Sequence, residues 1–156
     1  MAKTAQAVPL ELTLHRWAGY ILAVFYPIHV TATRFVPVLY DLTITTGFIA
    51  VPLVHTPFYF YYWYYGALAV AGFYHLWYGL PRALRGSGVR VLGVWRPGTT
   101  FFKYVSIAGC LVIASSILAL GGAYFPIQLS QVERYHEVTR DVYGRLFRLV
   151  GMEWKW

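Results

Sequence analysis

The chain contains 156 residues, of which 58% are hydrophobic, 19% aromatic and only 12% charged, and its formal net charge is +7. A soluble globular chain carries roughly 25% charged residues, so this composition excludes an intrinsically disordered chain and a typical water-soluble enzyme. The single Cys110 likewise excludes a disulfide framework and a cysteine-ligated metal site. We therefore predict an integral membrane protein.

Three apolar segments have the length of a transmembrane helix, which needs about 20 mostly apolar residues. They lie at about 13–34, 57–80 and 104–125. We predict an all-α integral membrane fold, in which these three helices form an up-down-up bundle within a membrane-anchor domain of residues 1–125. Residues 126–156 are predicted to form an amphipathic tail on the outer face of the membrane.

The connection between the first two helices, residues 35–56, is apolar but interrupted. Pro37, Asp41 and Pro52 disfavour a continuous helix across it. We expect an interfacial connection between the two helices. It has room for a short re-entrant or surface helix. The alternative is a fourth span, which would move the exit of the third helix to the opposite side of the membrane.

The basic residues predict the orientation. The loop at 81–100 and the start of the third helix contain no acidic residue. Under the positive-inside tendency, this face and the amino terminus lie on the cytoplasmic or matrix side. We attribute the positive charge to topology and to attraction for anionic lipids, and we expect no nucleic-acid partner. The basic residues of this region are Arg82, Arg85, Arg90, Arg96 and Lys103.

The tail has its own pattern. Apolar residues recur at near-helical spacing between Gln131 and Val150, and charged residues stand between them. This periodicity predicts an amphipathic helix, suited to lying on lipid or on a partner subunit at the outer face.

Polar groups inside a membrane span are costly, so each is a candidate for function. Neutral imidazoles in an apolar helix bundle bind haem iron well. Ala71, Gly72 and Gly79 lie on the same helix face as His75 and leave room for a flat macrocycle. An equally good explanation is ordinary small-residue helix packing around a hydrogen-bonded histidine. The candidates in the spans are His15, Arg16, His29, His75, Ser115 and Ser116.

Depth separates the histidines. At 1.5 Å per residue, His75 lies on the order of 8 Å from the inner end of its helix and His29 on the order of 20 Å from the inner end of the first helix. These two cannot ligate one iron, whereas His15 and Arg16 have the depth to approach His75. Arg16 could pair with a haem propionate or donate to a quinone carbonyl. Because packed helices leave little room for a haem, we expect a second axial ligand from another subunit.

At these residues the chain resembles the cytochrome b membrane-anchor subunit of succinate dehydrogenase, the large anchor of complex II. His15-Arg16-Trp17-Ala18-Gly19 is similar to the H-R-x-x-G motif that begins the family's first helix. Phe73-Tyr74-His75-Leu76-Trp77-Tyr78-Gly79-Leu80 is similar to its Y-H-x-W-x-G-[IL] segment. The resemblance covers roughly the first 125 residues.

The resemblance implies site roles. His75 is then the axial ligand of a b-type haem, and His15 and Arg16 lie by the haem propionates and the ubiquinone site. Arg82, one place later than the family's basic residue, is a further propionate candidate. The family's quinone-pocket serine aligns with Leu12, which leaves Thr13 or Glu11 as its substitute. Trp17 is a further candidate for that pocket. His29 has a rough counterpart in relatives with two haems.

The predicted function is a membrane anchor in respiratory electron transfer, which binds haem b and contributes to ubiquinone reduction but does not itself oxidise succinate. The implied partners are a flavoprotein subunit, an iron–sulfur subunit and a second anchor that supplies the other haem ligand. Accessory subunits are expected on the tail, and the mitochondrial inner membrane is favoured over a bacterial membrane. The alternatives are a haem-free structural or assembly subunit and a free-standing b-type cytochrome.

Overall fold

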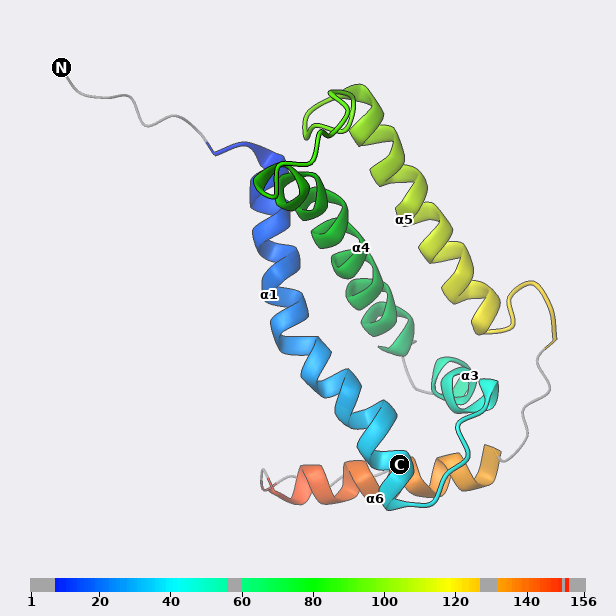
Figure 1. Ribbon diagram of the computed structural model, residues 1–156. Coiled ribbons are helices and arrows are strands. Elements are labelled where there is room, and N and C mark those ends of the chain that lie inside the picture. Colours follow the sequence, from blue (N-terminus) through cyan, green and yellow to red (C-terminus); the bar gives the residue numbers. More distant parts are fainter. Residues whose placement is uncertain (1–7, 56–59, 127–131, 150, 152–156) are drawn as a thin grey trace. The chain divides into compact units, whose positions relative to one another are not determined.

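The computed structural model describes residues 8–55, 60–126, 132–149 and 151, and within these ranges the chain contains helices and no strands (Figure 1). The all-α prediction is confirmed for this part. The chain divides into two compact units: the first comprises the described residues of Met1–Val30 and Trp63–Ile117, and the second those of Thr31–Tyr62 and Leu118–Trp156. The predicted division at residue 125 stays a prediction. The helices are α1 (Leu10–Val30), η1 (Thr31–Phe35), α2 (Val36–Leu39), α3 (Thr46–His55), α4 (Phe60–Gly86), α5 (Thr100–Leu120) and α6 (Val132–Leu149).

Two helices in the described ranges are long and apolar enough to cross a membrane. They are the continuous helix Leu10–Leu39 and α5, and in the most apolar stretch of each only 6% of the residues are buried. Leu111 and Val112 on α5 are both 65% exposed. A helix in the core of a soluble protein would bury such side chains, and large exposed apolar surfaces need a partner or lipid to cover them.

The first helix is longer than predicted. It begins at Leu10 rather than near residue 13 and continues past 34 to Leu39. Its path includes a wider π turn, η1, which ends at Phe35, two residues before Pro37. Proline has no backbone N–H to donate to the preceding turn, and a π turn accommodates such an interruption without ending the helix.

The predicted end of the second helix at Leu80 was wrong. Pro81 lies inside α4 and is buried, and the helix continues to Gly86. The chain leaves the helical path at Gly88, whose φ of 82° is readily adopted only by glycine. The N–H of Val89 donates to the carbonyl of Leu84 at 2.9 Å, which satisfies a carbonyl left free at the helix end. The predicted residues 57–59 lie outside the described part.

The boundaries of the third predicted helix also change. α5 begins at Thr100 rather than 104, because the Thr99 hydroxyl accepts a hydrogen bond from the N–H of Phe102 at 3.2 Å and caps the helix. It ends at Leu120 rather than 125, where Gly122 adopts a φ of 82° and the N–H of Ala123 donates to the carbonyl of Leu118 at 3.0 Å.

In the first unit, α4 contacts both α1 and α5 (Figure 1). On the α5 side, a Cβ at Gly109 would overlap the ring of Phe73, so this glycine forms a socket for the aromatic side chain. Nearby, Phe102 is 1% exposed and packs against Trp77 at a centroid distance of 5.6 Å. The contact between α4 and α5 thus combines a glycine socket for Phe73 with a stack of large aromatic rings.

In the second unit, α6 packs against α3 and the turn before it. The buried side chain of Tyr135 donates to the carbonyl of Thr43 at 3.0 Å and contacts the ring of Phe48 at a centroid distance of 5.7 Å. Leu53 on α3 is also buried. At ten residues, α3 is about 15 Å long, half of a bilayer's hydrocarbon thickness. The described helix is therefore short for the fourth span considered from the sequence.

A second contact in this unit is charged. The Tyr40 hydroxyl donates to Asp141 at 2.6 Å, and Arg145 donates from Nε to both oxygens of the same carboxylate at 3.0 Å. The hydrogen bonds from Arg145 and Tyr40 lower the pKa of Asp141. The same carboxylate raises the pKa of Tyr40, because a bonded phenol gives up its proton less readily. Asp141 thus joins α6 to the turn that follows α2.

We expect this contact to weaken in acid. Because the folded-state pKa of Asp141 is lowered, its stabilising contribution is present above the ordinary carboxyl pKa of about 3.9 and is lost as the pH falls through the folded value. Hydrogen exchange of the α6 amides, corrected for the intrinsic effect of pH, should therefore increase as the pH falls through this range. Asp141→Asn should exchange faster at pH 7 and lose this acid dependence. Equal exchange in both proteins at pH 7 would contradict the role of the contact.

Candidate functional site

The two motif histidines lie against each other in the first unit. The rings of His15 on α1 and His75 on α4 are stacked, with centroids 4.2 Å apart and an interplanar angle of 16°. The proximity expected from their depths is confirmed.

Two glycines allow this approach. A Cβ at Gly19 would lie 3.3 Å from Cε1 of His75, and a Cβ at Gly79 would lie 3.5 Å from Cε1 of His15. Each histidine thus packs over the glycine of the opposite motif. The first of these distances is tighter than an ordinary contact, so a larger residue at position 19 would force His75 to move.

The ring nitrogens of the pair have different surroundings. Nδ1 of His75 is 3.4 Å from the carbonyl oxygen of His15 and, when protonated, donates a long hydrogen bond to it. Nδ1 of His15 is buried and has no hydrogen-bond partner among the described residues. A buried polar atom without a partner is costly, and such atoms often mark a place that another group completes.

A tyrosine that the sequence reading did not select joins the pair. Tyr78 is 2% exposed, and its ring stacks on His15 with centroids 4.6 Å apart and an interplanar angle of 29°. The guanidinium carbon of Arg82 lies 3.9 Å from the centroid of the Tyr78 ring, a cation–π contact. The signal was present in the sequence, since Tyr78 is three residues after His75 and therefore shares its helix face.

The other candidates on α1 are not all brought to the pair. Arg16 is exposed, and no hydrogen bond or ion pair joins it to another described residue. Thr13 donates its hydroxyl to the carbonyl of Pro9 at 3.4 Å, within its own turn. Trp17 is 61% exposed and has the edge of its ring against Tyr20.

Trp17 also borders an apolar cleft of about 490 Å³ between α1, α4 and α5. Three small residues, Ala18, Ala67 and Ala71, leave this space open. Its size is within the range of pockets for small organic molecules. The other lining residues are Leu14, Ile21, Val70, Tyr74, Ser106, Ile107, Cys110 and Leu111.

His29 lies elsewhere. Its ring is 6.2 Å from that of Tyr64 and 6.0 Å from that of Tyr65, near the start of α4. His75 is ten residues further along α4 than Tyr65, about 15 Å at the helical rise. The expectation that His29 and His75 cannot share one iron is therefore supported by the contacts.

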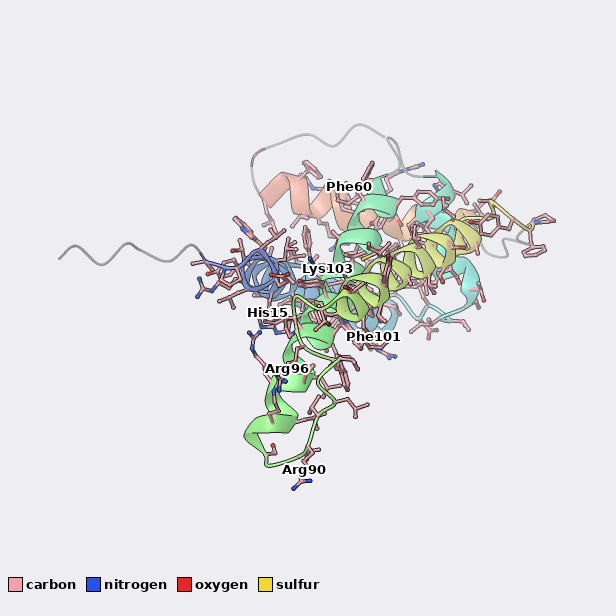
Figure 2. The ribbon with its side chains drawn as sticks, turned by 90° about the horizontal axis from the view of Figure 1, so that it is seen from above. His15, Phe60, Arg90, Arg96, Phe101 and Lys103 are labelled. Carbon is pink, nitrogen blue, oxygen red and sulfur yellow. The ribbon has the colours of Figure 1, made fainter. Side chains whose placement is uncertain are left out.

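The basic residues lie in the last turns of α4, in the loop that follows it and at the start of α5. Arg82 and Arg85 belong to the last turns of α4 rather than to a loop as predicted, and the loop proper is 87–99. Figure 2 shows Arg90 at the far end of this loop, whereas Arg96 and Lys103 lie closer to the helices. The loop is attached to the unit by Trp95, whose ring centroid is 5.0 Å from that of Trp77.

Comparisons with protein-family models, with curated proteins and with solved structures found no match to this chain.

Proposed function

We propose that the chain is a membrane-anchor subunit of succinate dehydrogenase, which binds a b-type haem through His75 and contributes to the ubiquinone-reduction site. The observation that carries this proposal is the stacked pair of His15 and His75, in which each ring packs over a glycine of the other motif. The pair brings together the two segments on which the resemblance to the anchor family rests.

The chemistry of His75 fits an axial ligand. A metal-binding histidine commonly donates its second ring N–H to a carbonyl, which fixes the tautomer and leaves the other nitrogen for the metal. Nδ1 of His75 has such a carbonyl at 3.4 Å. No hydrogen bond engages Nε2 within the described residues, and Nε2 is not one of the buried side-chain atoms that lack a partner there. The unpartnered Nδ1 of His15 adds a polar atom suited to a haem propionate or a bridging water. When bound, haem supplies one-electron transfer.

The geometry supports a haem whose two axial ligands come from two different subunits. Nearly parallel rings 4.2 Å apart do not aim their nitrogen lone pairs at a common atom. His15 and His75 are therefore poor candidates for the two ligands of one iron. A second anchor subunit that supplies the other ligand is consistent with this arrangement, and a free-standing cytochrome with both ligands in this pair is not.

The proposed contribution to a ubiquinone site rests on Arg16, Trp17 and the apolar cleft. The exposed guanidinium of Arg16 has no ion-pair partner in the described part of the chain, so it is available to donate to a quinone carbonyl. Trp17, the next residue, borders the cleft that suits an apolar ring. Thr13 and Arg82 remain proposed contacts, to the quinone and a haem propionate respectively.

We propose three spans in an up-down-up arrangement. α4 has 27 residues, about 40 Å, and no charge before Arg82. Its many tyrosines and tryptophans make it less apolar than α5, but their polar tips suit a membrane interface. The basic loop and amino terminus then face the matrix or cytoplasm, with the mitochondrial inner membrane favoured. The tail helix α6 lies on the outer face against lipid or accessory subunits.

The test is purification of the full chain from its native membrane in mild detergent. We expect a flavoprotein, an iron–sulfur protein and a second small membrane subunit to co-purify, with a b-type band in the reduced-minus-oxidised spectrum. Co-purification without that band would favour a haem-free structural subunit. A haem-containing chain isolated without soluble partners would favour a free-standing cytochrome, and either result would contradict the proposal.

A further inference from the structure

Tyr78 connects all three helices of the first unit. Its ring stacks on His15 of α1, lies under Arg82 of α4 and meets Phe102 of α5 edge-on at a centroid distance of 6.3 Å. Few side chains in the described ranges are buried as deeply, at 2% exposure. These contacts on different sides restrict how far the Tyr78 ring can move.

The ring, rather than the hydroxyl, makes these contacts. No hydrogen bond engages the Tyr78 hydroxyl within the described residues, whereas its ring face takes part in both the stack with His15 and the cation–π contact. Phenylalanine could reproduce both contacts. An aliphatic side chain of similar volume could fill the space but would provide neither a flat surface for an imidazole nor a π face for a cation.

His15 transmits this constraint to His75. The His15 ring stacks on His75, and its backbone carbonyl accepts the hydrogen bond from Nδ1 of His75. Without the Tyr78 ring, His15 gains rotational freedom, and one face of His75 loses its fixed neighbour. The plane of the His75 ring would then be held by a single long hydrogen bond and by Gly19.

We propose that Tyr78 is a positioning residue that determines the orientation of the His75 imidazole through His15 and holds the Arg82 cation beside the pair. This inference rests on the proposed function, in which His75 presents a nitrogen to haem iron. Groups that orient a ligating histidine tune the metal it binds. A fixed cation next to the pair would favour the reduced, less positive form of a bound haem.

The experiment compares the complete complex carrying wild-type chain, Tyr78→Phe, Tyr78→Leu or Tyr78→Met. Its readouts are the low-temperature electron paramagnetic resonance of the ferric haem, which reports the orientation of axial imidazoles, and the midpoint potential from optical titration. We expect Tyr78→Phe to match wild type. Tyr78→Leu and Tyr78→Met should retain haem but show a shifted or broadened low-spin signal and a lower midpoint potential. Tyr104→Leu on α5, where the tyrosine is exposed, is the matched control for loss of a ring.

Each other outcome overturns the inference. Unchanged signals in Tyr78→Leu and Tyr78→Met exclude positioning, and an equally large change in Tyr78→Phe assigns the effect to the hydroxyl. Failure of both aliphatic variants to assemble, with Tyr78→Phe intact, indicates packing alone. The proposed function fails separately, when the wild-type complex has no b-type band.

Discussion

Replacing His75 by alanine is expected to abolish the b-type absorption band of the assembled complex. The substitution removes the only nitrogen of this chain proposed to bind the iron, and a methyl group cannot replace a metal–nitrogen bond. The measurement is the reduced-minus-oxidised spectrum, normalised to flavin content so that loss of haem is distinguished from loss of complex.

His29→Ala is the matched control for His75→Ala, because it removes a histidine of the same unit that contacts Tyr64 and Tyr65 instead of the pair. We expect its band to equal that of wild type. A full band in His75→Ala would contradict ligation by His75. A band reduced in His29→Ala would instead indicate the second haem considered from the sequence.

Replacing Arg16 by alanine should slow quinone reduction with the complex intact. A hydrogen bond from a charged donor contributes about 1.5–3 kcal/mol, so its loss in the transition state predicts a decrease of about 10- to 150-fold in kcat/KM for ubiquinone. Succinate oxidation with an artificial acceptor that bypasses the quinone site should be unchanged.

Two further variants sharpen the Arg16 test. Arg16→Lys keeps the charge without the planar donor geometry and should recover part of the activity. Arg90→Ala removes a cation of the distant loop and should have no effect (Figure 2). Wild-type kcat and KM in Arg16→Ala would exclude a role for Arg16. An equal loss in Arg90→Ala would assign the effect to general electrostatics.

The helices could be predicted from the sequence, but their ends could not. Long apolar runs indicate helices without reference to the rest of the chain. Pro81 looked like a terminator, yet it is buried inside α4, because tertiary packing outweighs the loss of one backbone hydrogen bond. The actual ends depend on the conformations of Gly88 and Gly122 and on the cap at Thr99. These signals are single residues and compete with similar ones nearby.

The depths of the site residues along their helices could be predicted from the sequence, but the rotation of each helix about its own axis could not. Counting residues placed His15 and His75 at a common height. Whether Tyr78 or Arg16 also joins them depends on how far each helix is rotated about its axis, which spacing does not determine. The docking of α6 was missed for a different reason. Its contacts, such as Tyr40 with Asp141, join residues about a hundred positions apart, and no local pattern reports them.

Each histidine packs over the glycine of the other motif, and this packing sets the register between α1 and α4. In each motif the glycine follows the histidine by four residues, so α1 and α4 fit together only when each histidine faces the opposite glycine. Sliding α1 along α4 by one turn, about 5.4 Å, would bring the Cβ of Ala23 or the ring of His15 to the place of Gly19. The pair therefore fixes the position of His75 relative to α1, and substitutions at Gly19 or Gly79 should change the position of the site before they change its chemistry.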